Sequence, residues 1–197
     1  MNNRCKKRKK IVICISGMAG CGKSTVARKL AEKYGLKYYS GGEALKALAI
    51  EFGYKSVERG WWESKEGLSF LRQRGRDSSF DRRIDERLLE AAKAGDVVLD
   101  SWTMPWLLKD GFKVWLECSE KVRAERLVKR DGISFQVALR VLRDKEKRTK
   151  RIYKGLYGFD LGEDFSPFDL ILDVSLLSAD EVLQAVSLVV ENLLLRR

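Results

Sequence analysis

Residues 17–24 read Gly-Met-Ala-Gly-Cys-Gly-Lys-Ser, which is a glycine, four free positions and then Gly-Lys-Ser. This spacing is typical of a P-loop, in which glycines let consecutive backbone N–H groups curl around an anion without crowding by side chains. The apolar run 11–15 before it predicts a strand that is buried on both faces. The apolar stripe within 24–34 predicts a helix whose N-terminus points its partial positive charge at the anion. The motif and its context therefore predict a P-loop α/β fold.

The P-loop motif also assigns a binding function to each of its residues. We expect Lys23 to reach the β- and γ-phosphate oxygens of a bound nucleotide, and the Ser24 hydroxyl to help hold Mg²⁺. The predicted nucleotide-binding residues are Gly17, Met18, Ala19, Gly20, Cys21, Gly22, Lys23, Ser24 and Thr25.

The net charge and the amino-acid composition limit the possible partners and mechanisms. The 197 residues carry a formal net charge of +11 and contain no histidine. The charge favours anionic partners, and the absence of histidine excludes every mechanism that needs a histidine base. Residues 1–10 form a basic segment that is not followed by the combination of an apolar run and a small-residue cleavage site that marks a secretory signal, so we expect a solvated tail that binds nucleic acid only weakly. We expect a cytoplasmic monomer with no membrane span, in which residues 11–197 form a single domain.

The four cysteines do not form a metal-binding pattern. Cys14 and Cys118 lie in apolar runs and are expected in the core. A helix N-terminus lowers the pKa of a thiol, so Cys21 is a candidate reactive cysteine. The alternative is that Cys21 only fills a free position of the P-loop.

Strands and helices are predicted to alternate along the rest of the chain. This order predicts a doubly wound parallel sheet of five strands. The further strands are expected at 37–39, 96–100, 112–118 and 168–173. Within 42–92, the glycine-interrupted stretch 52–76 predicts short helices and loops, and we expect the whole segment to be a mobile lobe. Trp61 and Trp62 are expected to pack this lobe, with stacking on a base as the alternative.

Charged residues mark two further parts of the predicted site. Asp100 ends a buried strand, where an acidic residue helps to position Mg²⁺; the alternative is a capping residue of the next turn. Two arginine-rich helices within 123–154 flank a glycine turn, and we expect them to form a lid that grips phosphates. The lid residues predicted to act in catalysis, together with Lys23, are Arg126, Arg130, Arg148 and Arg151. The alternative is a pair of solvated helices.

With these segments identified, residues 10–194 resemble the nucleoside monophosphate kinases, and most closely the archaeal cytidylate kinases. Ser40-Gly41-Gly42-Glu43 is similar to the Ser/Thr-Gly-Asp segment of that family, and Gly95 to Asp100 is similar to its Gly-Asn/Asp-Val-Val-Leu-Glu strand. Tyr157-Gly158-Phe159-Asp160 and Ser166-Pro167-Phe168-Asp169 resemble two later motifs. The resemblance implies transfer of a phosphoryl group from ATP, with Mg²⁺, to CMP or dCMP. It implies substrate contacts by Ser40, Lys46, Arg83, Asp100 and Trp102, and Mg²⁺ binding by Ser24 and Asp100.

Two positions depart from the family pattern. Lys46 replaces an arginine and offers only a point charge to the acceptor phosphate. The family's Glu-Gly-Arg appears as Asp100-Ser101-Trp102, so a second arginine is missing. Two alternatives therefore stay open: a P-loop kinase for AMP or a small metabolite, and a nucleotide-binding regulatory or RNA-associated protein whose acceptor site has decayed.

Overall fold

Five parallel strands form one sheet at the centre of the molecule. The structure is a computed structural model that describes residues 10–57 and 60–192, so most of the expected basic tail at 1–10 lies outside the described residues. The strands are β1 (Val12–Ser16), β2 (Lys37–Ser40), β3 (Val97–Asp100), β4 (Phe112–Glu117) and β5 (Leu170–Asp173), in the order β2-β3-β1-β4-β5. The predicted five-stranded doubly wound sheet is confirmed.

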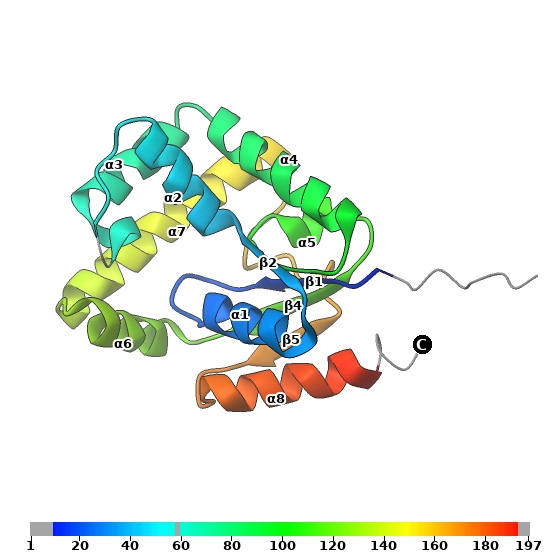
Figure 1. Cartoon of the computed structure of the whole chain (residues 1–197). Helices are drawn as coiled ribbons and strands as arrows, with labels where there is room; N and C mark the ends of the chain where they lie inside the picture. The colour runs from blue at the N-terminus through cyan, green and yellow to red at the C-terminus, as the bar shows by residue number, and fades with distance from the viewer. Residues whose placement is uncertain (1–9, 58–59, 193–197) are drawn as a thin grey trace, which may run out of the picture.

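Helices cover both faces of this sheet (Figure 1). They are α1 (Lys23–Tyr34), α2 (Gly41–Glu51), α3 (Lys65–Arg74), α4 (Ser79–Ala94), α5 (Met104–Leu107), α6 (Glu120–Asp131), α7 (Phe135–Tyr157) and α8 (Ala179–Val190), with a 3-10 turn, η1, at Trp61–Glu63. Helices α1 and α8 pack on one face, and α2, α4 and α5 pack on the other. Helix α5 was not anticipated. Among the described residues, no helix is both long and apolar enough to cross a membrane.

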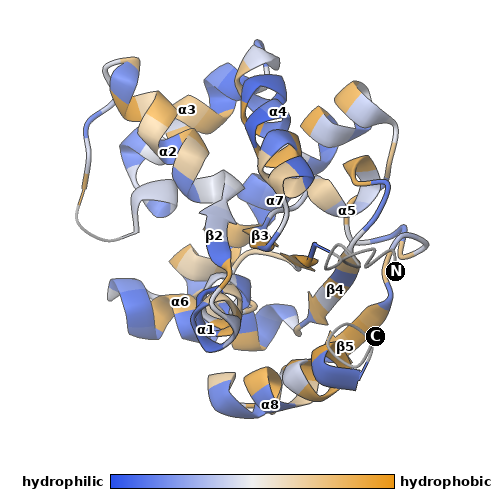
Figure 2. Ribbon diagram, turned by 45° about the vertical axis from the view of Figure 1, so that its right-hand side comes forward, coloured by the Kyte–Doolittle hydropathy of each residue, from blue (hydrophilic) through white to orange (hydrophobic). Residues whose placement is uncertain are grey.

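Alternation along β1 supplies both faces of the core. Ile13 and Ile15 pack in the cluster with α1 and α8, whereas Cys14 packs in the cluster with α2 and α4. All three side chains are fully buried, as expected for a central parallel strand with helices on both sides. Figure 2 shows largely apolar residues on β4 and β5 and a mixture of hydrophilic and apolar residues along the helices.

Polar caps define where several helices begin. The side chains of Ser40, Ser64, Ser119, Ser134 and Ser178 accept hydrogen bonds from backbone N–H groups in the first turns of α2, α3, α6, α7 and α8. Each such cap satisfies a donor that the helix itself leaves unpaired, and it stabilises the helix by about 1 kcal/mol. Local sequence therefore fixes the start of each of these helices.

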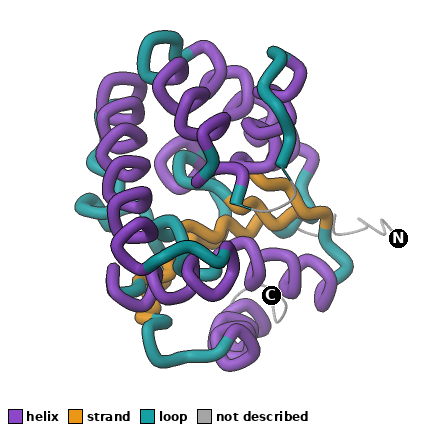
Figure 3. Tube along the Cα trace, turned by 90° about the vertical axis from the view of Figure 1, so that its left-hand side faces the viewer, coloured by secondary structure: helices purple, strands orange, loops and turns teal. Residues whose placement is uncertain are grey.

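The parallel register brings distant residues to one edge of the sheet. Asp100 pairs with Ile15 of β1 and with Ser40 of β2, so the carboxyl ends of the three strands meet. The P-loop, residues 17–24, follows β1 at this edge and leads into α1. Figure 3 shows the strands in the middle of the molecule with helices above and below them. In an open α/β sheet the ligand binds at such an edge.

Candidate active site

The P-loop has backbone conformations that demand glycine. Gly17, Gly20 and Gly22 have φ values of 145°, 82° and 99°. A Cβ on Gly17 would lie 2.5 Å from the carbonyl oxygen of Leu116, which leaves no room for any side chain. The loop is therefore a concave backbone surface that suits an anion.

A buried carboxylate lies beside the P-loop. Asp100 is 3% exposed, and its Oδ2 accepts hydrogen bonds from Ser24 Oγ at 2.5 Å, Tyr38 OH at 3.2 Å and Ser40 Oγ at 3.3 Å. Among the described residues, Ser16 Oγ at the end of β1 is a buried hydroxyl without a hydrogen-bond partner. The Ser24–Asp100 pair presents hard oxygen ligands next to the anion-binding backbone, and these residues fit a magnesium ion.

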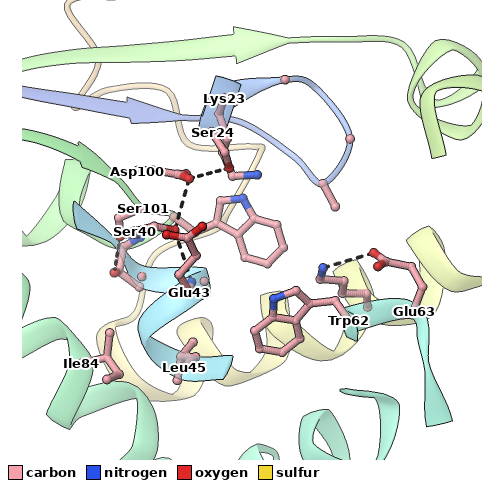
Figure 4. Close-up of a pocket in the computed structure, with 18 of the residues that line it drawn as sticks. Lys23, Ser24, Ser40, Glu43, Leu45, Trp62, Glu63, Ile84, Asp100 and Ser101 are labelled. Carbon is pink, nitrogen blue, oxygen red and sulfur yellow. Dashed lines mark hydrogen bonds and ion pairs between the residues drawn. The ribbon is translucent and has the colours of Figure 1, made fainter. Parts of the chain in front are cut away.

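One cavity of about 430 Å³ extends from the P-loop to the helices above the sheet. Figure 4 shows Lys23, Ser24 and Asp100 at one end and Leu45 and Ile84 at the other. The residues that line it come from the P-loop, α1, α2, η1, α3, α4, the segment after β3, α6 and α7. Elements far apart in the chain thus enclose a space of the size that small ligands occupy.

Trp102 occupies the position where the resembled family has an arginine. Its indole Nε1 donates a hydrogen bond to the carbonyl oxygen of Gly17, and Lys23 Nζ lies 5.3 Å from the centre of its ring. The indole therefore holds the first glycine of the P-loop and makes a cation–π contact with the P-loop lysine. It is part of the cavity wall, as the resemblance implied, but it supplies no charge.

Lys145 is a cavity residue that sequence reasoning missed. Its Nζ lies 5.0 Å from the Trp62 ring centre, 6.0 Å from that of Trp102 and 3.6 Å from Glu63 Oε1. Its side chain is 12% exposed, and burial lowers the pKa of its ammonium to about 8. Lys145 therefore brings a second ammonium to the cavity, and this one titrates close to physiological pH.

Buried polar groups form the wall opposite the P-loop. Arg74 makes a paired ion contact with Asp81, in which Nε lies 3.0 Å from Oδ2, and its Nη2 donates to Tyr153 OH at 3.4 Å. Asp85 accepts hydrogen bonds from Thr103 and from Tyr157 OH. Burial raises the pKa of Asp85 to about 6. These groups offer both donors and acceptors to a ligand.

The predicted arginines are not all brought together. Arg126 and Arg130 line the cavity: Arg126 Nη1 donates to the carbonyl oxygen of Cys21 at 2.7 Å, and Arg130 Nη2 lies 3.1 Å from Glu63 Oε2. Arg148 and Arg151 line a different cavity, between α3, α4 and α7.

The other predicted residues divide in the same way. Ala19, Gly20, Gly22, Lys23, Ser24, Thr25, Ser40, Asp100 and Trp102 line the main cavity; Gly17, Met18, Cys21, Lys46 and Arg83 do not.

Of the two interpretations of Cys21, burial supports the packing residue and contradicts the reactive thiol. Its side chain is 2% exposed, and burial raises the pKa of the thiol above its usual value, although the neighbouring Lys23 lowers it. Desolvation outweighs the helix N-terminus here because the side chain packs in the core cluster that contains Ile15 and Leu116. Cys21 is a packing residue.

The two neighbouring tryptophans have different environments. Trp61 is 3% exposed, and its Nε1 donates to the carbonyl oxygen of Lys55, so it packs the lobe as expected. Trp62 is half-buried and lines the cavity. The sequence indicated this part of the cavity only through the pair of adjacent tryptophans. It did not indicate which of the two rings faces the cavity.

Comparisons with known proteins agree with this geometry. Residues 12–176 match the family described as "Cytidylate kinase-like family". The chain is 35% identical over 185 residues to the cytidylate kinase of Pyrococcus horikoshii, which covers 93% of this chain and 90% of that protein. It is 35% identical over 188 residues to the cytidylate kinase of Methanocaldococcus jannaschii, which covers 93% and 99%.

Solved structures share the fold at lower sequence identity. Shikimate kinase from Bacteroides thetaiotaomicron superposes with a TM-score of 0.57 at 17% identity, and the match covers 93% of this chain and 99% of that chain. Shikimate kinase from Acinetobacter baumannii gives 0.56 at 18% identity, with 95% and 97% covered. At this identity the likeness shows the fold alone.

Proposed function

Because the chain belongs to the cytidylate kinase-like family, we propose that it transfers the γ-phosphoryl group of ATP to CMP or dCMP, giving CDP or dCDP. One observation carries the proposal: a single cavity joins the P-loop and the Ser24–Asp100 pair to a wall of buried polar groups. The two substrates of a phosphoryl transfer must meet in line in one enclosed space. A monophosphate bound against that wall points its phosphate at Lys23.

The P-loop end of the cavity binds the donor. The backbone N–H groups around Gly20 and Gly22 bind phosphate oxygens, and Lys23 neutralises charge on the transferred group. Ser24 and Asp100 would hold Mg²⁺, which supplies charge neutralisation and fixes the phosphate chain when it is bound. The Ser24 hydroxyl donates to Asp100 Oδ2 at 2.5 Å, so the two oxygens that would hold the ion lie side by side.

Cationic side chains stabilise the negative charge on the phosphoryl group as it is transferred. The acceptor phosphate is ionised at neutral pH and attacks without a general base, so catalysis consists of positioning and electrostatic stabilisation. Positive charge comes from four side chains that line the cavity: Lys23, Arg126, Arg130 and Lys145. In this proposal Lys145 supplies charge that the family obtains from an arginine at the position of Trp102.

The wall opposite the P-loop recognises the base. Arg74, Asp81 and Asp85 present hydrogen-bonding groups at the edge of a space whose sides are Trp62 and Ile84. A cytosine ring offers both a donor amino group and acceptor atoms, and it stacks on an indole. Buried polar groups discriminate strongly, because a ligand that cannot pair them leaves them unsatisfied.

We also infer that residues 42–92 and 123–154 close over the substrates as a lobe and a lid. Glu63 of the lobe contacts Arg130 of α6 and Lys145 of α7, so the two parts already touch. Closure excludes water, which otherwise competes as phosphoryl acceptor.

A coupled assay with ATP and a panel of monophosphates tests the proposed function. We expect turnover with CMP and dCMP, and at least tenfold lower kcat/KM with UMP, AMP and GMP. The Lys23→Ala variant provides the background rate. A protein that phosphorylates AMP best is a P-loop kinase for another acceptor. A protein that phosphorylates none of the five, while binding ATP, contradicts the proposal and favours the regulatory alternative.

A further inference from the structure

A second cavity of about 510 Å³ lies on the far side of the wall formed by Arg74. It is enclosed by the C-terminal end of α3, the N-terminal end of α4 and the C-terminal half of α7, the elements near the top of Figure 1. Six of the residues that line it are arginines: Arg72, Arg74, Arg76, Arg82, Arg148 and Arg151. No Asp or Glu is among the described residues that line it. We call it the arginine groove.

Most of these guanidinium groups lack a counter-charge. Arg74 is held by Asp81, and Arg148 is paired with Asp144 one turn earlier on α7. Within residues 10–57 and 60–192, Arg72, Arg76, Arg82 and Arg151 make no ion pair, and all four are exposed. Like charges that converge from three helices repel one another. An anionic ligand bound between them replaces this repulsion with attraction.

The floor of the arginine groove is apolar and open. Leu71, Ile152 and Leu156 line it together with the arginines, and Gly75 and Gly155 contribute no side chain. A Cβ on Gly155 would meet no atom within 4 Å, although this glycine lies inside α7, where it costs about 1 kcal/mol relative to alanine. The missing side chain leaves space in the wall of the groove.

We propose that the arginine groove is a second binding site, outside the phosphoryl-transfer cavity, for a nucleoside di- or triphosphate. The phosphate chain binds the planar, multiply donating guanidinium groups of α3, α4 and α7. The base covers the apolar floor. The inference stands on this geometry and does not depend on the proposed kinase activity.

The shape of the groove favours a small polyphosphate over a polynucleotide. Its volume is close to the 430 Å³ of the main cavity and falls within the range of small-ligand sites. Its arginines converge on one space, whereas a nucleic-acid surface extends its charges along a strand. Arg74 lines both cavities, so the two ligands would bind on opposite sides of one ion-paired wall.

Calorimetric titration of the full chain with CTP and with inorganic tripolyphosphate tests the site. Two binding sites per chain are expected for both probes, one at the P-loop and one in the groove. Arg82→Glu reverses a charge in the groove, and Gly155→Glu adds a carboxylate to its lining. Each variant is expected to weaken binding at the groove site by about 10- to 100-fold and to leave binding at the P-loop site unchanged. Lys23→Ala is expected to weaken binding at the P-loop site only.

Arg87→Glu is the matched control. Arg87 lies on α4 as Arg82 does, is exposed, and does not line the groove. It should retain both sites, because it changes the net charge equally without changing the groove. A single site in the wild type, or equal weakening by Arg82→Glu and Arg87→Glu, overturns the proposal. Tight binding of a 12-nucleotide RNA that depends on Arg82, with no second CTP site, also overturns it and assigns the groove to nucleic acid.

Discussion

The Nζ atom of Lys145 lies 5.0 Å from the centre of the Trp62 ring, so an ammonium is buried against an indole inside the cavity. Burial lowers its pKa to about 8, although Glu63 opposes this shift. Below pH 8 the group is protonated and attracts phosphate; above pH 8 it becomes neutral. We therefore expect kcat/KM for CMP to fall as the pH rises from 7 to 9.5.

Two variants isolate Lys145 as the source of this pH dependence. Lys145→Arg keeps its charge over the whole range, so its profile should stay flat up to pH 9.5. Lys147→Arg changes an exposed lysine of the same helix and should keep the wild-type decline. If Lys145→Arg declines as the wild type does, another group titrates and Lys145 does not bind the phosphate.

Trp102→Arg should improve acceptor binding. An arginine at this position can make a charge-assisted contact of roughly 1.5–3 kcal/mol with the acceptor phosphate, so KM for CMP should fall about tenfold or more. Trp102→Leu removes the indole without adding charge and should not lower KM. Steady-state kinetics at saturating ATP compares the three proteins. An equal fall in KM for both variants would attribute the effect to the vacated volume rather than to the charge.

Lys23→Ala should abolish most of the activity and preserve the fold. Lys23 stabilises the negative charge that develops on the transferred phosphoryl group, so kcat should fall by about 10²- to 10³-fold when it is removed. Lys33→Ala changes an exposed lysine at the other end of α1 and should change kcat less than twofold. Melting temperatures measured without nucleotide should agree for all three proteins. A loss of several degrees in Lys23→Ala alone would indicate a structural cause.

Asp81→Asn should destabilise the protein strongly. Asp81 and Arg74 are both almost fully buried, and removing one partner leaves the other charge unpaired at a cost of about 3–5 kcal/mol. Urea unfolding measures the change in the free energy of unfolding. The double variant Arg74→Met, Asp81→Leu removes both charges and should recover most of the loss. A cost below about 1 kcal/mol for Asp81→Asn would show that water reaches the guanidinium.

Local patterns account for most of what the sequence predicted. The P-loop and the strand ending at Asp100 are short segments whose backbone and burial follow from nearby residues. Their contact, between Ser24 and Asp100, follows from the rule that parallel strands end at one edge of a sheet. Helix α5 was missed because four residues with a proline at the second position show no helical period.

The phase of α7 explains why Arg148 and Arg151 lie apart from Lys23. Arg148 and Arg151 were grouped with the lid because charge is dense there. Thr149, Ile152 and Tyr153 are the buried residues of this half of the helix, and they continue the apolar stripe of its first half. Lys145 lies on that stripe, whereas Arg148 and Arg151 lie beside it and face the arginine groove. The 3.6-residue period of α7 could have predicted that Lys145, and not Arg148 or Arg151, faces the main cavity. The high density of charged residues in this half of the helix obscured that period.

The order of the strands has a consequence for synthesis of the protein on the ribosome. The central strand β1 is the first to be made, yet its partners β3 and β4 come far later, since Val12 pairs with Val97 and Ile13 with Phe112. At roughly 5 to 20 residues per second, about 5 to 20 seconds separate Ile13 from Phe112. Until β3 is made, this apolar strand, which the finished fold buries on both faces, has no neighbouring strand, and it lacks its second one until β4 is made. The nascent chain is then most exposed to aggregation and to capture by chaperones, and folding can be completed only after β4 emerges.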